Sequence, residues 1–260
     1  MTYISRSPAR ETVYLDRPIW HALRTRQHHL CLSSGEAVMF RPEVSHFGAT
    51  GSSGDGDVEG FVKLVNQSIG GVAVMQTEPF EPPSALRSTS RAEGLQMVLQ
   101  TLPKRRLAPS ICALSTVDVP EMLRLVALTE PGPFRVRTGT LGSYLGVRHQ
   151  GRLIAMAGER LKVPGFTEIS AVCVHPDHRG SGLARALVTA LINLILSRSE
   201  TPMLHLYRDN HPARSLYESL GFQLRAPVYI EVMESTRAKA KLDEKNTSQP
   251  SLDIMAGRHD

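Results

Sequence analysis

The chain has 260 residues, of which 41% are hydrophobic and 21% are charged, proportions that are ordinary for a folded globular protein. This length is enough for one large domain or two small ones. No apolar run approaches the roughly eighteen residues of a membrane span, and the first residues lack the apolar core of a signal peptide. The sequence therefore predicts a cytoplasmic protein that makes no use of a membrane.

The charge and the cysteines bear on partners and metals. A net charge of +5 raises nucleic-acid binding as an alternative, but the one basic cluster, 104–106, lies between two prolines as in a solvated linker. A basic chain also suits an enzyme whose cofactor carries several phosphates. Cys31, Cys112 and Cys173 are widely spaced and odd in number, so they predict neither a disulfide framework nor a metal site.

The first part of the chain, residues 1–102, is predicted to form a smaller α/β N-terminal domain of unknown role. Its expected elements are a helix around Ile19 to Leu30, a helix at Val58–Ser68, a strand at Gly71–Met75 and a short apolar piece at Leu95–Leu99. The histidines of the first helix have no carboxylate or cysteine partner at ligand spacing, so we expect no metal there. No motif in this part indicates a chemistry.

The second part begins after an expected linker at 103–109 and extends over 110–234, followed by a disordered polar tail at 235–260. Its strands are expected at Ile111–Leu114, Tyr144–Arg148, Leu153–Leu161, Glu168–Val174, Met203–Tyr207 and Val228–Met233. Short turns join the second, third and fourth of these into an antiparallel meander. Helices are expected over residues 119–127, 183–195 and 212–220, the first of them capped by Asp118 or Thr116.

A glycine-rich turn between a strand and a helix is the most informative motif. The apolar strand residues Val172 and Val174 are followed by Pro176 and then by the segment 179–184, which reads Arg-Gly-Ser-Gly-Leu-Ala and begins an apolar helix. Backbone N–H groups and the helix dipole favour an anion at such a helix start. Glycines allow an anion to approach the backbone and allow a positive φ. The segment therefore predicts a phosphate-binding site.

Two further features follow this turn. Asn210 begins the next expected helix, and Tyr217 lies within it before a Gly-Phe stop at 221–222. This order of strand, glycine turn, helix, strand and Asn-initiated helix resembles the acetyl-CoA-binding core of the GNAT acetyltransferase superfamily over residues 108–233. The resemblance implies an α+β fold, with a mixed, mostly antiparallel central sheet flanked by helices. It also implies the donor acetyl-CoA and no metal.

The resemblance implies roles for individual residues on the cofactor side. Backbone groups of Val172, Cys173 and Val174 match the strand that holds the pantetheine arm and the thioester carbonyl. The segment 179–184 matches the pyrophosphate loop, and Asn210 matches a cofactor-contacting asparagine. The predicted cofactor-binding residues are Val172, Cys173, Val174, Arg179, Gly180, Ser181, Gly182, Leu183, Ala184 and Asn210. No cysteine is placed to carry an acyl group, which predicts direct transfer through a ternary complex.

The predicted proton-transfer residues are Tyr217, Glu168 and His205. Tyr217 matches the acid of the family, and a phenol with a pKa near 10 is close enough to a thiol to protonate a departing thiolate. Glu168 and His205 are alternatives for the base: each occupies a position where some GNAT enzymes carry a catalytic glutamate. Glu159 is a third candidate. The sequence does not rank Glu168 and His205.

The predicted activity is acetyl transfer to an amine of a small molecule, a peptide or a protein. The sequence leaves open whether the protein forms a homodimer. The alternative is a module that binds acetyl-CoA without turnover and acts as a sensor or regulator. A role in nucleic-acid binding is suggested by the charge alone, and we expect none.

Overall fold

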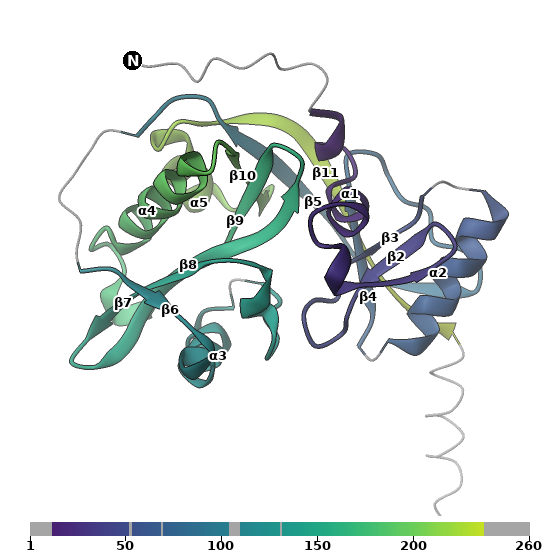
Figure 1. Cartoon of the computed structure of the whole chain (residues 1–260), viewed down its shortest axis with the longest axis horizontal. Helices are drawn as coiled ribbons and strands as arrows, with labels where there is room; N and C mark the ends of the chain where they lie inside the picture. The colour runs from purple at the N-terminus through teal and green to yellow at the C-terminus, as the bar shows by residue number, and fades with distance from the viewer. Residues whose placement is uncertain (1–11, 52–53, 69, 104–109, 131, 237–260) are drawn as a thin grey trace, which may run out of the picture.

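The computed structural model describes residues 12–51, 54–68, 70–103, 110–130 and 132–236. Its centre is an eight-stranded sheet with helices on both faces, and a three-stranded sheet with its own helix lies beside one end (Figure 1). The predicted linker falls almost wholly on residues 104–109, and the predicted tail on residues 237–260, which lie outside the described residues. No helix in the described ranges has the length and apolar composition to cross a membrane.

The large sheet has the strand order β4-β11-β5-β10-β9-β8-β7-β6. Its strands are β4 (Val72–Gln76), β5 (Leu86–Leu99), β6 (Cys112–Leu114), β7 (Tyr144–His149), β8 (Arg152–Val163), β9 (Phe166–Val174), β10 (Thr201–Tyr207) and β11 (Phe222–Ser235). Among the described strands, neighbours pair antiparallel except β9 and β10, which pair parallel. This confirms the predicted mixed, mostly antiparallel sheet.

The remaining elements cover the sheets. The small sheet comprises β1 (Cys31–Ser34), β2 (Ala37–Phe40) and β3 (Gly48–Ala49). The helices are α1 (Pro18–Arg24), α2 (Asp55–Gln67), α3 (Val119–Thr129), α4 (Leu183–Ser197) and α5 (His211–Ser219). Short 3-10 turns are η1 (Thr12–Leu15), η2 (His28–Leu30), η3 (Thr116–Asp118), η4 (Thr138–Leu141) and η5 (Pro176–His178). Helices α4 and α5 pack on one face of the large sheet, and α1 and α3 pack on the other.

Strand β5 is the element that ties the two parts of the sequence together. It comes from the predicted N-terminal domain but lies between β10 and β11 of the second part, with His205 opposite Gln96 and Phe222 opposite Leu99. Strand β4 then extends the sheet beyond β11. The large sheet therefore extends across the boundary that we predict at 102–103. Strand β4 forms one edge of this sheet and β5 lies inside it, and both precede the boundary.

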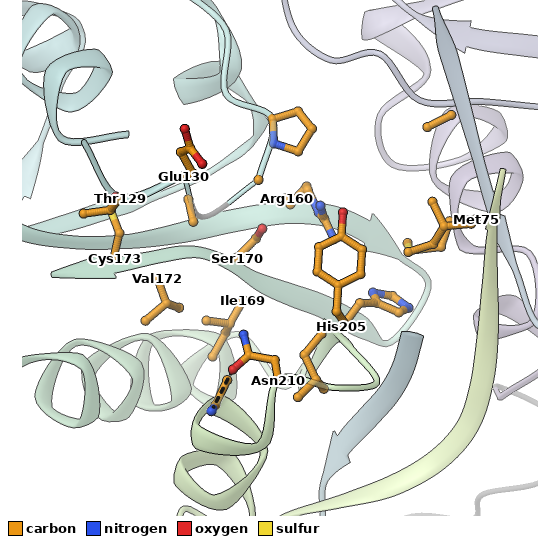
Figure 2. Close-up of a pocket in the computed structure, with 18 of the residues that line it drawn as sticks. Met75, Thr129, Glu130, Arg160, Ile169, Ser170, Val172, Cys173, His205 and Asn210 are labelled. Atoms are coloured by element: carbon orange, nitrogen blue, oxygen red, sulfur yellow. Dashed lines mark hydrogen bonds between the residues drawn. The ribbon is translucent and has the colours of Figure 1, made fainter. Parts of the chain in front are cut away.

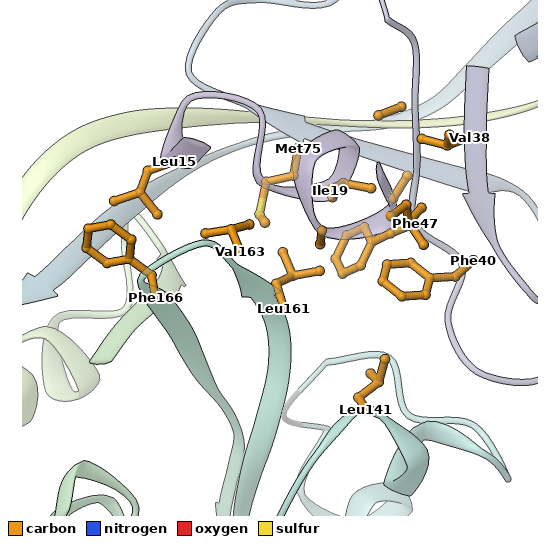
Figure 3. Close-up of a cluster of buried hydrophobic side chains, with 14 of the residues drawn as sticks. Leu15, Ile19, Val38, Phe40, Phe47, Met75, Leu141, Leu161, Val163 and Phe166 are labelled. Atoms are coloured by element: carbon orange, nitrogen blue, oxygen red, sulfur yellow. The ribbon is translucent and has the colours of Figure 1, made fainter. Parts of the chain in front are cut away.

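A hydrophobic cluster also joins the two parts. Ile19 from α1 and Phe40 and Met75 from the N-terminal strands pack together with Leu161 of β8 and Phe166 of β9 (Figure 3). All five side chains are buried, and Ile19, Phe40 and Leu161 are fully so. Burying such a set stabilises a fold by about 2 kcal/mol for each large side chain. Removing the N-terminal part would expose half of this core.

We predict that a fragment of residues 110–234 does not fold on its own. Strand β5 lies between β10 and β11, so without it both strands lose a hydrogen-bonding partner. Their backbone N–H and C=O groups on that side would then be unsatisfied. Circular dichroism and calorimetry with acetyl-CoA should show a largely unfolded fragment that binds no ligand. Coexpression with residues 1–103 should restore folding. A lone fragment that folds and binds as the full chain does would contradict the shared-sheet account.

Candidate active site

A cavity opens where the two parallel strands separate. Strands β9 and β10 pair only from Phe166 opposite Thr201 to Glu168 opposite Met203, although both strands continue beyond this point. The cavity has a volume of about 440 Å³ and is lined by the diverging halves of β9 and β10 and by the start of α5 (Figure 2). Arg179, which precedes α4, residues at and after the end of α3, and N-terminal residues complete the lining. The sheet itself therefore creates a space for a ligand.

A bulge in β9 changes which face its residues present. Gly158 of β8 lies opposite Ser170 and Met156 lies opposite Cys173, so β9 carries an extra residue between these pairs. Ala171 has a φ of 52°, in the left-handed region that residues with a Cβ adopt rarely. Ile169 packs under α4 whereas Cys173 packs under α3, although residues four apart share a face in a regular strand. The bulge thus reorients the backbone at the predicted pantetheine strand.

The predicted cofactor residues of this strand line the cavity. Val172, Cys173 and Val174 all contribute to its wall. The thiol of Cys173 packs among Met122, Met156 and their neighbours, and burial raises its pKa to about 11. A thiol held protonated in an apolar cluster is a poor nucleophile.

The glycine-rich turn has the backbone that an anion site requires. Gly180 and Gly182 have φ values of 76° and 80°, and Gly182 is the N-cap residue of α4. A Cβ added at either glycine would meet no atom within 4 Å, so the space beside the turn is open. Arg179 is exposed and lines the cavity. Of the other predicted loop residues, Ser181 is exposed, Ala184 is half-buried, and Leu183 is buried in the core under α4.

Helix α5 brings Asn210 and Tyr217 to the same cavity. The side-chain oxygen of Asn210 accepts a hydrogen bond from the N–H of Ala213 at 3.1 Å and so caps the helix, drawn as a dashed line in Figure 2. This leaves the amide N–H groups of Asn210 free for a ligand. Burial raises the pKa of Tyr217 to about 12, so its hydroxyl is protonated at neutral pH. Its ring packs edge-on against Phe222.

Glu168 is fully buried in a charge pair and does not line the cavity. Arg160 donates to both of its carboxylate oxygens, at 2.9 and 2.5 Å, and the backbone N–H of Leu161 donates to one of them. Burial alone would raise the pKa of Glu168, but Arg160 and then His205 outweigh it and lower this pKa to about 2. The carboxylate therefore stays ionised, and its two oxygens are occupied by protein donors.

His205 lines the cavity, but both of its ring nitrogens have protein partners. Its Nδ1 lies 2.7 Å from Glu168, and its Nε2 lies 2.9 Å from Nε2 of Gln96. Gln96 is itself held in one orientation, because its oxygen accepts from Arg225 and its amide group donates to the carbonyl of Leu15. This pattern places a proton on Nδ1, which donates to Glu168, and makes Nε2 the acceptor from Gln96. The ring nitrogens are thus engaged within the protein.

Four residues that line the cavity come from the N-terminal part, and our sequence reasoning missed them: His46, Phe47, Ala73 and Met75. The N–H of Ala73 donates to the carbonyl of His46 at 2.9 Å, and Phe47 and Ala73 form a parallel bridge. This bridge places the small sheet beside β4 and against the cavity. None of the four belongs to a recognisable motif, and only the pairing of distant segments brings them here.

Comparison with known proteins identifies the family. The chain is similar to a solved structure from Novosphingobium aromaticivorans described as a GNAT-family acetyltransferase, with 37% sequence identity and a TM-score of 0.79. The similarity covers 85% of this chain and 98% of that one. The chain belongs to the GNAT family. The model of the FR47-like protein family also matches residues 144–230, which span β7 to β11.

Two curated acetyltransferases match shorter segments. A mycothiol acetyltransferase of Kocuria rhizophila is 39% identical over 100 residues, which are 38% of this chain and 29% of that protein. The N-alpha-acetyltransferase RimI of Mycobacterium tuberculosis is 36% identical over 83 residues, which are 31% of this chain and 51% of that protein. The matches thus span about half or less of these relatives.

The third base candidate of this GNAT protein, Glu159, lies outside the cavity lining. Its carboxylate is fully buried and pairs with Arg198 at 2.5 Å and with Lys162 at 2.9 Å, and it accepts from the N–H of Ser143. Across the described residues, no group of three or more His, Cys, Asp or Glu side chains could hold a metal ion. The geometry of Glu159 is that of an anchor for the neighbouring loops.

We predict that Glu168→Gln is destabilised by about 3 kcal/mol or more at pH 7, because it leaves the Arg160 guanidinium buried without a counterion. The folded pKa of Glu168 lies below its unfolded value, so its contribution is complete above the unfolded value, about 4.5, and is lost as the pH falls towards 2. Urea unfolding should therefore show a smaller gap between wild type and variant at about pH 3.5.

The matched control is Glu218→Gln, which breaks an exposed pair with Arg214 on α5. Exposed pairs contribute at most about 1 kcal/mol, so this variant should unfold almost as the wild type does. Equal stability losses for the two variants, or a gap for Glu168→Gln that does not change with pH, would contradict the buried-pair account.

Proposed function

We propose that this protein is an N-acetyltransferase that moves the acetyl group of acetyl-CoA directly to an amine in a ternary complex. The observation that carries the proposal is the opening between β9 and β10, which is lined by the bulged strand and, at one end, by Arg179 of the glycine-rich segment. GNAT acetyltransferases use acetyl-CoA as donor. The name of one curated relative, an N-alpha-acetyltransferase, supports a nitrogen acceptor.

The residues present fit the donor along the cavity. The free N–H groups at the start of α4 would hold the pyrophosphate, since a helix N-terminus with glycines at positive φ concentrates donors and partial positive charge. Arg179 adds a full positive charge at this end, and Asn210 offers amide N–H groups. The bulge at Ala171 turns strand backbone towards the thioester end. Acetyl-CoA supplies an activated acyl group when it is bound.

Tyr217 is the proposed acid. The acceptor nitrogen forms the bond to the acetyl carbonyl carbon, the carbon–sulfur bond breaks, and the hydroxyl proton of Tyr217 goes to the thiolate that leaves. Burial raises the pKa of Tyr217 to about 12, so the hydroxyl carries its proton at neutral pH. The hydroxyl has no hydrogen-bond partner among the described residues, and the ring lines the cavity.

Glu168 and His205 are better described by a positioning role than by the base role that the sequence suggests. A carboxylate with a pKa of about 2 is a weak proton acceptor at neutral pH. The free ring nitrogen of His205 that a base needs is taken by Gln96. We propose that the two residues hold Arg160 and the opening of the sheet in place, and that the amine loses its proton to solvent.

The first prediction concerns the pyrophosphate site. Gly182→Val adds a side chain at a φ of 80° and beside the N–H groups, so the affinity for acetyl-CoA should fall about tenfold or more. Calorimetry on the folded variant checks this. Gly151→Val is the matched control, because Gly151 has a φ of 79° and open space at its Cβ but lies in the turn between β7 and β8 and not at the start of a helix. Equal affinities in wild type and both variants would overturn the proposed site.

The second prediction concerns proton transfer. Tyr217→Phe removes one hydroxyl and keeps the ring, so turnover should fall roughly 10²-fold while acetyl-CoA binding is unchanged. Release of CoA with a panel of amines measures the turnover. Tyr229→Phe, which changes a tyrosine outside the cavity lining, is the control and should behave as wild type. Full activity in Tyr217→Phe would remove this residue from the mechanism and leave the cofactor site standing.

A further inference from the structure

The cavity has two chemically different ends. One end carries Arg179, the first residue of the glycine-rich segment, and Asn210, which the proposed function assigns to the donor. The other end, towards the point where β9 and β10 begin to pair, is bordered by the N-terminal part of the chain and by β11. In Figure 2, Met75 lies on the side of His205 that is away from Cys173 and Val172. The proposed function leaves this second end for the acceptor.

The walls of the second end are largely apolar. They are formed by side chains of β4, of β11 and of the bridge: Phe47, Ala73, Met75, Ile230 and Val232. Phe47, Ala73 and Met75 are buried, and they pack in the same cluster as the core of the N-terminal part. Such a wall favours an acceptor with an apolar body, at about 25 cal/mol for each Å² that is removed from water.

Arg160 is the cationic group at this end. Its Nε and Nη2 are used by Glu168, and its guanidinium lies 5.0 Å over the ring of Phe47. Its Nη1 has no hydrogen-bond partner among the described residues and is not among the enclosed unpaired atoms. Because 17% of the side chain is exposed and the residue lines the cavity, Nη1 is free to donate to a ligand.

A neighbouring imidazole also lies at this end. His46 stacks on Phe47 and lines the cavity. Burial first, and then the charges of Arg160 and Arg135, lower the pKa of His46 to about 4. A half-buried imidazole that stays neutral beside two guanidinium groups adds no positive charge of its own but offers a ring N–H. An anionic group is the ligand chemistry that matches this arrangement.

We propose that the acceptor is an amine that carries an apolar body and a carboxylate, as an apolar α-amino acid does, with the carboxylate on Nη1 of Arg160. This rests on the proposed function, because it names the substrate class of the same site. Hydrogen bonds between a guanidinium and a carboxylate are among the strong ones in proteins. The pair with Glu168 holds the guanidinium in one place, so the carboxylate would fix the direction in which the amine points.

The first test uses binding and requires no turnover. Calorimetry in the presence of CoA compares N-acetyl-L-leucine with N-acetyl-L-leucinamide, which lacks the charge, and with N-acetylglycine, which lacks the apolar body. We expect the leucine acid to bind about tenfold or more tightly than its amide, since a hydrogen bond to a charged group contributes on that order. It should also bind more tightly than the glycine compound. Equal affinities of acid and amide overturn the proposal.

The second test uses a conservative variant with a matched control. Arg160→Lys keeps a positive charge beside Glu168 but removes the guanidinium Nη1 that is proposed to bind the carboxylate. The preference for acid over amide should therefore disappear. Arg198→Lys makes the same change at an arginine that pairs with the buried carboxylate of Glu159 outside the cavity, and it should keep the preference. If Arg160→Lys does not fold, the comparison of ligands on the wild type still decides.

A measurement of turnover distinguishes two outcomes: that the acceptor class is wrong, and that the protein is not a transferase. CoA release is compared for L-leucine, L-leucinamide and 3-methylbutylamine, with each rate expressed per free amine because their amine pKa values differ. Acetylation of all three at similar rates keeps the transferase and overturns the carboxylate requirement. If acetyl-CoA binds but no amine is acetylated, the transferase proposal fails, and the calorimetric preference alone decides the ligand class.

Discussion

The buried pair of Arg160 and Glu168 fixes the point at which the central sheet opens. Glu168 is opposite Met203 in the last pair of β9 and β10, and Arg160 comes from the neighbouring strand β8. A desolvated ion pair is tolerated only when its hydrogen bonds are satisfied. Here Leu161 and His205 provide the remaining hydrogen bonds of the Glu168 carboxylate, and Gln96 of β5 hydrogen-bonds the second ring nitrogen of His205. Four adjacent strands of the sheet are thereby held together at the base of the cavity.

This constraint explains why the N-terminal part belongs to the site. Gln96 reaches His205 only because β5 lies next to β10, and Arg225 of β11 holds Gln96 from the other side. The bridge between Phe47 and Ala73 then sets the wall of the cavity that faces away from the glycine turn. The donor end is built mainly from residues after 170 and the opposite end largely from residues before 76. Each end alone would be an open surface.

Much of the second part could be predicted from the sequence, because its signals are local. Alternating apolar residues and short turns gave β7, β8 and β9, and glycines at 180 and 182 marked the start of α4. The polar first half of β5 was missed for a physical reason. Residues 86–93 are mostly exposed and pair with β11 alone, so they carry no apolar pattern, whereas 94–99 lie between two strands and read as a short apolar run.

The site residues divide in the same way. Arg179, Asn210 and Tyr217 are placed by helix starts and helix spacing, and all three line the cavity. Glu168 was placed on the right strand, but a sequence does not show which cation a carboxylate will meet, and Arg160 decides its protonation. His46 was not found because its neighbours Phe47 and Ala73 are 26 residues apart in the chain and meet only through the bridge.

The most direct test of this account is a crystal structure of the full chain with acetyl-CoA. We expect the pyrophosphate on the backbone N–H groups of residues 180–184, the pantetheine arm beside Val172–Val174 between the separated strands, and the acetyl group pointing towards Arg160. A donor bound outside the opening between β9 and β10, or with its acetyl group pointing away from the N-terminal wall, would contradict the account.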